Sequence, residues 1–177
     1  MNRKTGVFYG SSTGTTARIA RKIGQLLNVA DNDIHDVAKT APSRVSDYDT
    51  LILGSSTWRD GQLQSDWYDF IDGLQALDLR GKKIAIFGCG DETMSDTFCN
   101  AVGEIRRRLA DTHAQFIGEF DKGSYGFTAS EATDTTTGRM YGLILDEVNH
   151  PELTPARLHA WTRLISDDIT DLRQNDV

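Results

Sequence analysis

The chain has 177 residues, of which 38% are hydrophobic and 25% are charged, with a formal net charge of −7. This composition is typical of a soluble globular protein, and the length favours one domain over residues 1–177. The negative charge argues against nucleic-acid partners, because such proteins need a basic face that neutralises phosphates. We expect a cytoplasmic protein without membrane contact, since no apolar stretch approaches the length of a membrane span or resembles a signal peptide.

Short apolar runs alternate along the chain with segments of helical periodicity. Continuous runs of Val, Ile, Leu and Phe are typical of strands that are covered on both faces. Alternating strands and helices predict an α/β fold with a doubly wound, five-stranded parallel sheet. The predicted strands are residues 6–9, 34–37, 50–54, 83–88, 115–120 and 140–145, and the predicted helices lie within 17–27, 67–77, 98–109 and 154–172.

Residues 121–139 interrupt this alternation. They are rich in Gly, Ser and Thr and show no helical periodicity. They separate two strand-like runs, 115–120 and 140–145, that would otherwise make one edge strand. We therefore predict a surface loop inserted into the last strand of the sheet.

A hydroxyl-rich segment, residues 10–16, lies between the first predicted strand and the first predicted helix. Its hydroxyls and the N–H groups of a helix N-terminus make an anion site. The segment contains no Lys or Arg, whereas phosphoryl transfer usually needs a cation at the moving charge. It also lacks the Gly-Lys pair of an ATP-binding loop. The residues therefore favour a site that holds a phosphate monoester, with an ordinary helix cap as the alternative.

Two further loops follow the third and fourth predicted strands. Ligands of open α/β sheets bind beyond the carboxyl ends of the strands, so these loops are expected next to residues 10–16. Loop 55–62 contains Trp58, which would either anchor the loop on the core or stack on a ligand. Loop 89–99 is rich in glycine and acidic residues. A phosphorylated planar ligand would contact all three loops.

The remaining reactive side chains form no recognisable catalytic or metal-binding pattern. Cys89 and Cys99 are the only cysteines, and we predict that both are buried as small hydrophobic residues. The four histidines are scattered singly, without the spacing of metal ligands. We therefore predict neither a metal site nor catalytic residues of the chain's own.

The motifs in the three loops and near the end of the chain resemble those of the long-chain flavodoxins. They are Thr13-Gly14-Thr15-Thr16, Leu51-Ile52-Leu53-Gly54, Thr57-Trp58, Gly61, Asp66-Trp67, Phe87-Gly88-Cys89-Gly90-Asp91, Phe98-Cys99, Gly142-Leu143, Leu145-Asp146-Glu147 and Pro151-Glu152-Leu153-Thr154. The resemblance covers essentially the whole chain. It implies a monomeric, low-potential one-electron carrier that binds FMN noncovalently. Such a protein is not an enzyme. Its partners would be redox proteins, namely a basic-surfaced flavodoxin reductase and acceptor enzymes.

The resemblance also implies individual roles. Residues 11–16 would hold the FMN phosphate, Trp58 would cover one flavin face, the Arg59–Asp60 peptide would lie next to flavin N5, and Asp146 would reach the ribityl hydroxyls. The family commonly has a tyrosine in the third loop, where this chain offers only Met94. Met94 would cover the second flavin face, leave it partly open, or pack into the core. The implied FMN-binding residues are Ser11, Ser12, Thr13, Gly14, Thr15, Thr16, Ser55, Ser56, Thr57, Trp58, Arg59, Asp60, Gly61, Cys89, Gly90, Asp91, Met94, Phe98, Cys99 and Asp146.

Acidic residues in and near the loops admit two interpretations. They would keep the flavin potential low and dock on basic partners, or they would form only a solvated rim. Two other functions also remain open at this point. One is a flavodoxin-like NAD(P)H:quinone reductase that transfers two electrons, although no nicotinamide or quinone pocket is recognisable. The other is a binding module that has kept the fold and lost FMN.

Overall fold

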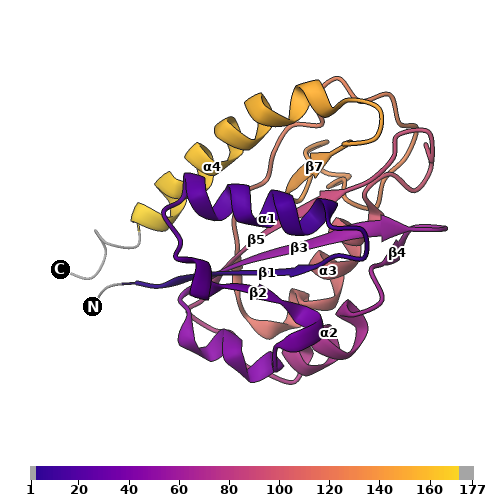
Figure 1. Cartoon of the computed structure of the whole chain (residues 1–177). Coiled ribbons are helices and arrows are strands. Elements are labelled where there is room, and N and C mark those ends of the chain that lie inside the picture. The colour runs from indigo at the N-terminus through magenta and orange to yellow at the C-terminus, as the bar shows by residue number, and fades with distance from the viewer. Residues whose placement is uncertain (1–2, 172–177) are drawn as a thin grey trace.

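A parallel sheet forms the centre of the computed structural model, which describes residues 3–171 (Figure 1). Its main strands follow the order β2-β1-β3-β5-β6, and each neighbouring pair is parallel. The prediction of a doubly wound α/β fold is therefore confirmed. These strands are β1 (Thr5–Gly10), β2 (Ile34–Asp36), β3 (Thr50–Trp58), β5 (Lys83–Cys89) and β6 (Gln115–Phe116).

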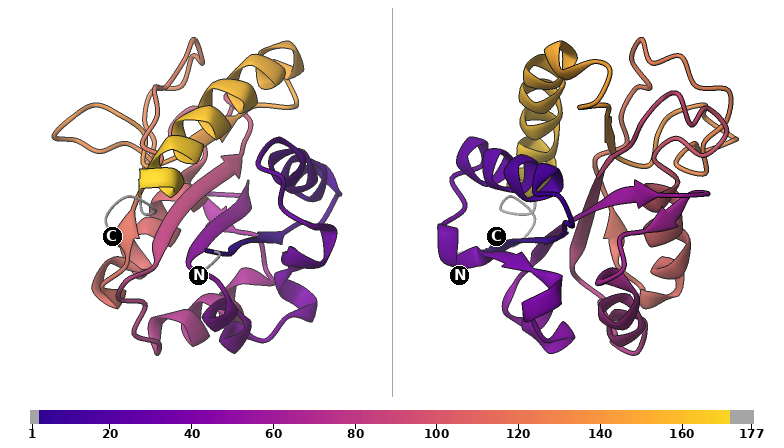
Figure 2. Two further views of the ribbon diagram at one scale, coloured as in Figure 1. Left: turned by 90° about the vertical axis from the view of Figure 1, so that its left-hand side faces the viewer. Right: turned by 45° about the vertical axis from the view of Figure 1, so that its right-hand side comes forward.

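Two pairs of helices cover the sheet. Helices α1 (Thr15–Leu26) and α4 (Thr154–Asp171) lie on one face, and α2 (Trp67–Gln75) and α3 (Asn100–Arg108) lie on the other (Figure 2). The predicted helices are confirmed to within a few residues, and Leu172 lies outside the described residues. Over residues 3–171, none of the helices combines the length and the apolar character needed to cross a membrane.

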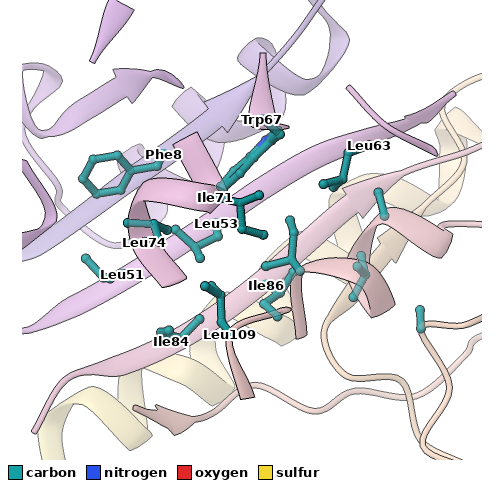
Figure 3. Close-up of a cluster of buried hydrophobic side chains, with 14 of the residues drawn as sticks. Phe8, Leu51, Leu53, Leu63, Trp67, Ile71, Leu74, Ile84, Ile86 and Leu109 are labelled. Carbon is teal, nitrogen blue, oxygen red and sulfur yellow. The ribbon is translucent and has the colours of Figure 1, made fainter. Parts of the chain in front are cut away.

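Each face of the sheet carries its own hydrophobic core. Phe8, Leu53 and Ile86 pack with α2 and α3 in the cluster of Figure 3. Their chain neighbours on the opposite face, such as Ile52 and Phe87, pack with α1 and α4. Because both faces are buried, the strands show continuous apolar runs rather than alternation. The polar side chains of a binding site are therefore expected in the loops at the ends of the strands.

The last strand position is split in two. Both β6 and β7 (Leu143–Leu145) pair with β5, so they occupy one edge of the sheet with residues 117–142 between them. The predicted insertion is confirmed, but the predicted strands 115–120 and 140–145 are too long. Gly118, with a φ of +82°, lies where the chain turns away from the sheet. Phe120 and Met140 then exchange backbone hydrogen bonds of 3.0 and 2.8 Å across the neck of the loop.

The chain returns to the sheet through a close backbone contact at Gly142. A Cβ atom at this position would lie 1.9 Å from the carbonyl oxygen of Ile86. We expect Gly142→Ala to lower the free energy of unfolding by about 1–3 kcal/mol in urea denaturation, because a backbone atom cannot move aside easily. Gly126→Ala is the matched control in the same insertion, since its Cβ would meet only Glu92 Oε2 at 3.9 Å. Equal losses for the two variants would contradict this account.

Candidate functional site

The three predicted loops lie together because their strands are neighbours. Gly10 at the end of β1 is paired with Ser55 of β3, and Ser56 is paired with Cys89 at the end of β5. The carboxyl ends of the three strands therefore meet at one edge of the sheet. This is the edge at which open α/β sheets bind ligands.

The first loop, residues 11–14, leads directly into α1 and has features of an anion site. Gly14 is the N-cap of α1 with a φ of +93°, and no side chain caps the helix. The Thr16 hydroxyl is buried without a hydrogen-bond partner, the sole such side-chain oxygen or nitrogen within residues 3–171. The Cys89 thiol lies beside it, but a thiol is only a weak hydrogen-bond donor and acceptor. An unpaired buried hydroxyl costs about 1–3 kcal/mol, so this loop fits a ligand that brings its own acceptor atoms.

A buried amide that sequence analysis missed joins the first two loops. Gln64 donates from Nε2 to the Ser12 hydroxyl over 3.1 Å, and its backbone N–H donates to the Ser55 hydroxyl over 3.2 Å. The same side chain exchanges hydrogen bonds with Asp66. Gln64 thus sets the distance between loops that are 52 residues apart in sequence. No local pattern marks such a residue.

The second loop is largely a β-hairpin, which corrects the predicted strand 50–54 and loop 55–62. β3 continues to Trp58 and turns back antiparallel as β4 (Gln62–Leu63), so that only residues 59–61 form the turn. The strand continues through polar residues because β5 and β4 satisfy its backbone groups. Trp58 is 40% exposed, and its indole N–H donates to the Ser56 hydroxyl over 2.8 Å. Its ring therefore lies at the rim and is not an anchor in the core.

The third loop, residues 90–99, presents Met94 to solvent. Met94 is 46% exposed, which excludes the interpretation that it packs into the core. Asp91 accepts hydrogen bonds from the hydroxyl and the backbone N–H of Thr93, which lower the pKa of its carboxyl. The loop is therefore organised locally, with its apolar side chain left accessible.

Three predicted site residues, at the two ends of the third loop, have buried side chains. Cys89, Phe98 and Cys99 are all buried, so the prediction that both cysteines are buried is confirmed. Burial raises the pKa of Cys89 to about 12 and that of Cys99 well above its usual value. Both thiols therefore stay protonated and unreactive at neutral pH.

Asp146, which the resemblance places at the ribityl hydroxyls, lies beneath the third loop. Its side chain is fully buried and accepts hydrogen bonds from the backbone N–H groups of Glu92 (3.0 Å), Val148 and Asn149 (both 2.9 Å). The Asn149 amide adds a fourth bond of 2.8 Å. A carboxylate committed in this way ties the third loop to the turn after β7. It positions the third loop.

The acidic residues around the loops fall into two groups. Asp60, Asp69 and Asp96 are exposed, and Asp72 is exposed but paired with Arg108 of α3. The exposed carboxylates give this edge a negative field. Among residues 3–171, no group of three or more His, Cys, Asp or Glu side chains is arranged to hold a metal ion.

Comparison with known proteins places the chain in a family. The family model described as flavodoxin matches residues 7–161. The chain belongs to the flavodoxin family. It is 39% identical over 166 residues to flavodoxin 1 of Escherichia coli K12, covering 93% of this chain and 94% of that protein. The Haemophilus influenzae flavodoxin is also 39% identical, over 165 residues, with 93% and 94% covered.

Solved flavodoxin structures share the fold. The Fusobacterium nucleatum flavodoxin bound to flavin mononucleotide superposes with a TM-score of 0.86 at 24% identity, covering 94% of this chain and 98% of that chain. Oxidised flavodoxin 2 of Bacillus cereus gives a TM-score of 0.68 at 27% identity, with 93% and 99% covered. Flavodoxins are electron-transfer proteins that act with redox partner proteins, and none of these comparisons supports a quinone reductase.

The hairpin turn contains a strained residue. Arg59 has a φ of +45°, in the left-handed region that costs a non-glycine residue about 1–2 kcal/mol. Arg59→Gly would relieve this strain, but the greater backbone entropy of glycine in the unfolded chain offsets about 0.5–1 kcal/mol of the gain. We therefore expect the variant to raise the unfolding free energy of the apoprotein by about 0.5–1 kcal/mol. Urea denaturation measures this change. The control Asp60→Gly relieves no strain and should lower stability; a loss in both variants would refute the strain.

Proposed function

We propose that this protein is a low-potential one-electron carrier that binds one FMN noncovalently and passes electrons from a basic-surfaced flavodoxin reductase to acceptor enzymes. The observation that carries the proposal is the unpaired, buried Thr16 hydroxyl in a cation-free loop at an uncapped helix start. The FMN in the Fusobacterium nucleatum structure, which has the same fold, supports it. FMN, when bound, supplies the electron-transfer chemistry.

Residues 11–16 hold the phosphate in this proposal. The backbone N–H groups at the start of α1 and the hydroxyls of Ser12, Thr13, Thr15 and Thr16 are neutral donors, and the helix dipole adds partial positive charge. Hydrogen bonds to a charged acceptor contribute about 1.5–3 kcal/mol each, so a few of them retain a dianion without an ion pair. The absence of a cation suits a phosphate that stays bound and does not react.

Trp58 and Met94 flank the ring system. Both side chains are exposed at the rim, one on the hairpin and one on the third loop. Trp58 stacks on one flavin face, and Met94 covers the other through a sulfur–aromatic contact. Together they exclude water from the ring. Poor solvation disfavours added negative charge, which keeps the potential low.

The exposed carboxylates complete the proposed function. Asp60 and Asp96 lie in the two loops that carry Trp58 and Met94. Their charge makes addition of electrons to a bound flavin less favourable. The same charge attracts a basic partner surface and orients the encounter. One domain acting as a monomer leaves this edge free for successive partners.

The Thr16 hydroxyl provides a test with two opposite readouts. We expect Thr16→Val to raise the unfolding free energy of the apoprotein by about 1 kcal/mol, because an unpaired buried hydroxyl is removed. The same change should weaken FMN binding about tenfold, because a charge-assisted bond is lost. Urea denaturation and flavin fluorescence quenching measure the two effects.

Thr162→Val is the matched control. The Thr162 hydroxyl is also buried but donates to the Leu158 carbonyl within α4 over 2.7 Å. This variant should leave FMN affinity unchanged and gain no stability. If Thr16→Val binds FMN as tightly as the unmodified protein does, Thr16 is not a phosphate ligand.

A reductive titration of the FMN-loaded protein, followed by visible absorbance, tests the proposal itself. A one-electron carrier takes up its two electrons in two resolved steps. A single two-electron step would instead support a reductase. Failure to retain FMN would support a binding module that has lost the cofactor.

A further inference from the structure

The Glu92 carboxylate lies where three segments of the chain meet. It belongs to the third loop, and its Oε1 lies 2.6 Å from Nε2 of His150 in the turn after β7. Its Oε2 accepts the backbone N–H of Gly126 in the insertion over 2.7 Å. The backbone N–H of Glu92 donates to Asp146. One residue therefore links the loop to both of its supports.

His150 faces a second carboxylate as well. Its Nδ1 lies 3.1 Å from Oε1 of Glu152, so each ring nitrogen has its own acceptor. Only the protonated imidazolium can donate to both. The hydrogen bonds with Glu92 and then Glu152 raise the pKa of His150 above its usual value of 6.5.

The other groups around His150 are a tyrosine of the insertion and several carboxyl groups. The Tyr125 ring of the insertion lies 6.1 Å from the imidazole, and burial raises the pKa of its hydroxyl to about 12. The acidic groups in the segments around the histidine are Asp91 and Glu92 on the third loop and Asp146, Glu147 and Glu152 on its own side. An arginine, Arg157, lies over the other ring, that of Tyr125, at 5.1 Å. His150 is thus a titratable base with carboxyl groups on both ring nitrogens.

The insertion also holds the residue that follows Met94. The backbone N–H groups of Thr128 and Ala129 donate to the Ser95 carbonyl over 2.7 and 3.0 Å. Phe127 packs on Phe98 with a ring separation of 5.1 Å. The part of the loop between Glu92 and Phe98 is thus fastened at both ends to the insertion. Met94 lies between these ends, and its backbone N–H donates to the Asp91 carbonyl over 3.0 Å.

We propose that Glu92 and His150 are positioning residues that hold the third loop, with Met94, in its flavin-covering position, and hold it more firmly when His150 is protonated. This inference rests on the proposed binding of FMN at that loop. The pKa of His150 is higher in the folded protein than in the unfolded chain, where it is about 6.5. The contribution of protonated His150 to holding the loop is therefore complete below about pH 6.5 and is lost as the pH rises through the pKa of the folded protein. FMN binding should weaken over the same interval.

The test compares FMN dissociation constants between pH 6 and 9 by flavin fluorescence quenching. His150→Gln keeps one donor to Glu92 but cannot titrate. We expect its dissociation constant to exceed that of the unmodified protein on the order of threefold at pH 6 and to match it at pH 9. The FMN phosphate itself titrates in this range, but it affects both proteins equally, so its effect cancels in the ratio of the two dissociation constants at each pH. His113→Gln, at an exposed histidine beside Asp78, is the control and should give a ratio of one throughout.

A ratio for His150→Gln that does not change with pH would overturn the proposal. NMR titration of the full-length apoprotein separates this outcome from failure of the proposed function. The His150 ring and the Gly126 amide should report the same apparent pKa, above 6.5, and Glu92→Gln should lower it. A His150 pKa of about 6.5, together with a Gly126 amide whose chemical shift does not change with pH, would refute the positioning role even if FMN does not bind.

Discussion

The rest of this structure depends on the N-terminus of α1. It follows β1 after the short first loop, lies at the carboxyl ends of the strands and has no side-chain cap. Two hydrophobic cores cover the faces of the sheet and leave only its edges for polar chemistry. At the N-terminus of α1, the backbone N–H groups, the helix dipole and an unpaired hydroxyl suit an anion, which we propose to be the phosphate of FMN. In the proposed function, the N-terminus of α1 anchors the phosphate, and the second and third loops flank the flavin ring because of where they lie relative to this anchor.

Buried polar side chains hold the other two loops against the anchor. Gln64 joins the first loop to the hairpin, and Asp146 joins the third loop to the turn after β7. Both are almost completely buried, and their hydrogen bonds offset the cost of taking polar groups out of water. Each would leave unpaired partners behind if replaced. The exposed surfaces of Trp58 and Met94 are thus carried by a framework that is fixed from below.

Most of the fold was predictable because strands buried on both faces read as continuous apolar runs and helices as a 3.6-residue period. The second half of β3 was missed because Ser55, Ser56 and Thr57 are polar, although backbone pairing with β5 keeps them extended. The burial of Asp146 and its bonds to three backbone N–H groups were not predictable, because a sequence does not show burial. The Gln64 bridge and the Glu92–His150 pair join residues 52 and 58 positions apart, and no local pattern records such contacts.

The central claim is that a phosphate held by neutral donors supplies much of the cofactor affinity. Binding of FMN and of riboflavin to the apoprotein, measured side by side by calorimetry, tests it most directly, because the two ligands differ only in the phosphate. The account predicts that FMN binds at least about a hundredfold more tightly, as two or more charge-assisted hydrogen bonds require. Equal affinities would show that residues 11–16 do not hold the phosphate and would contradict the account.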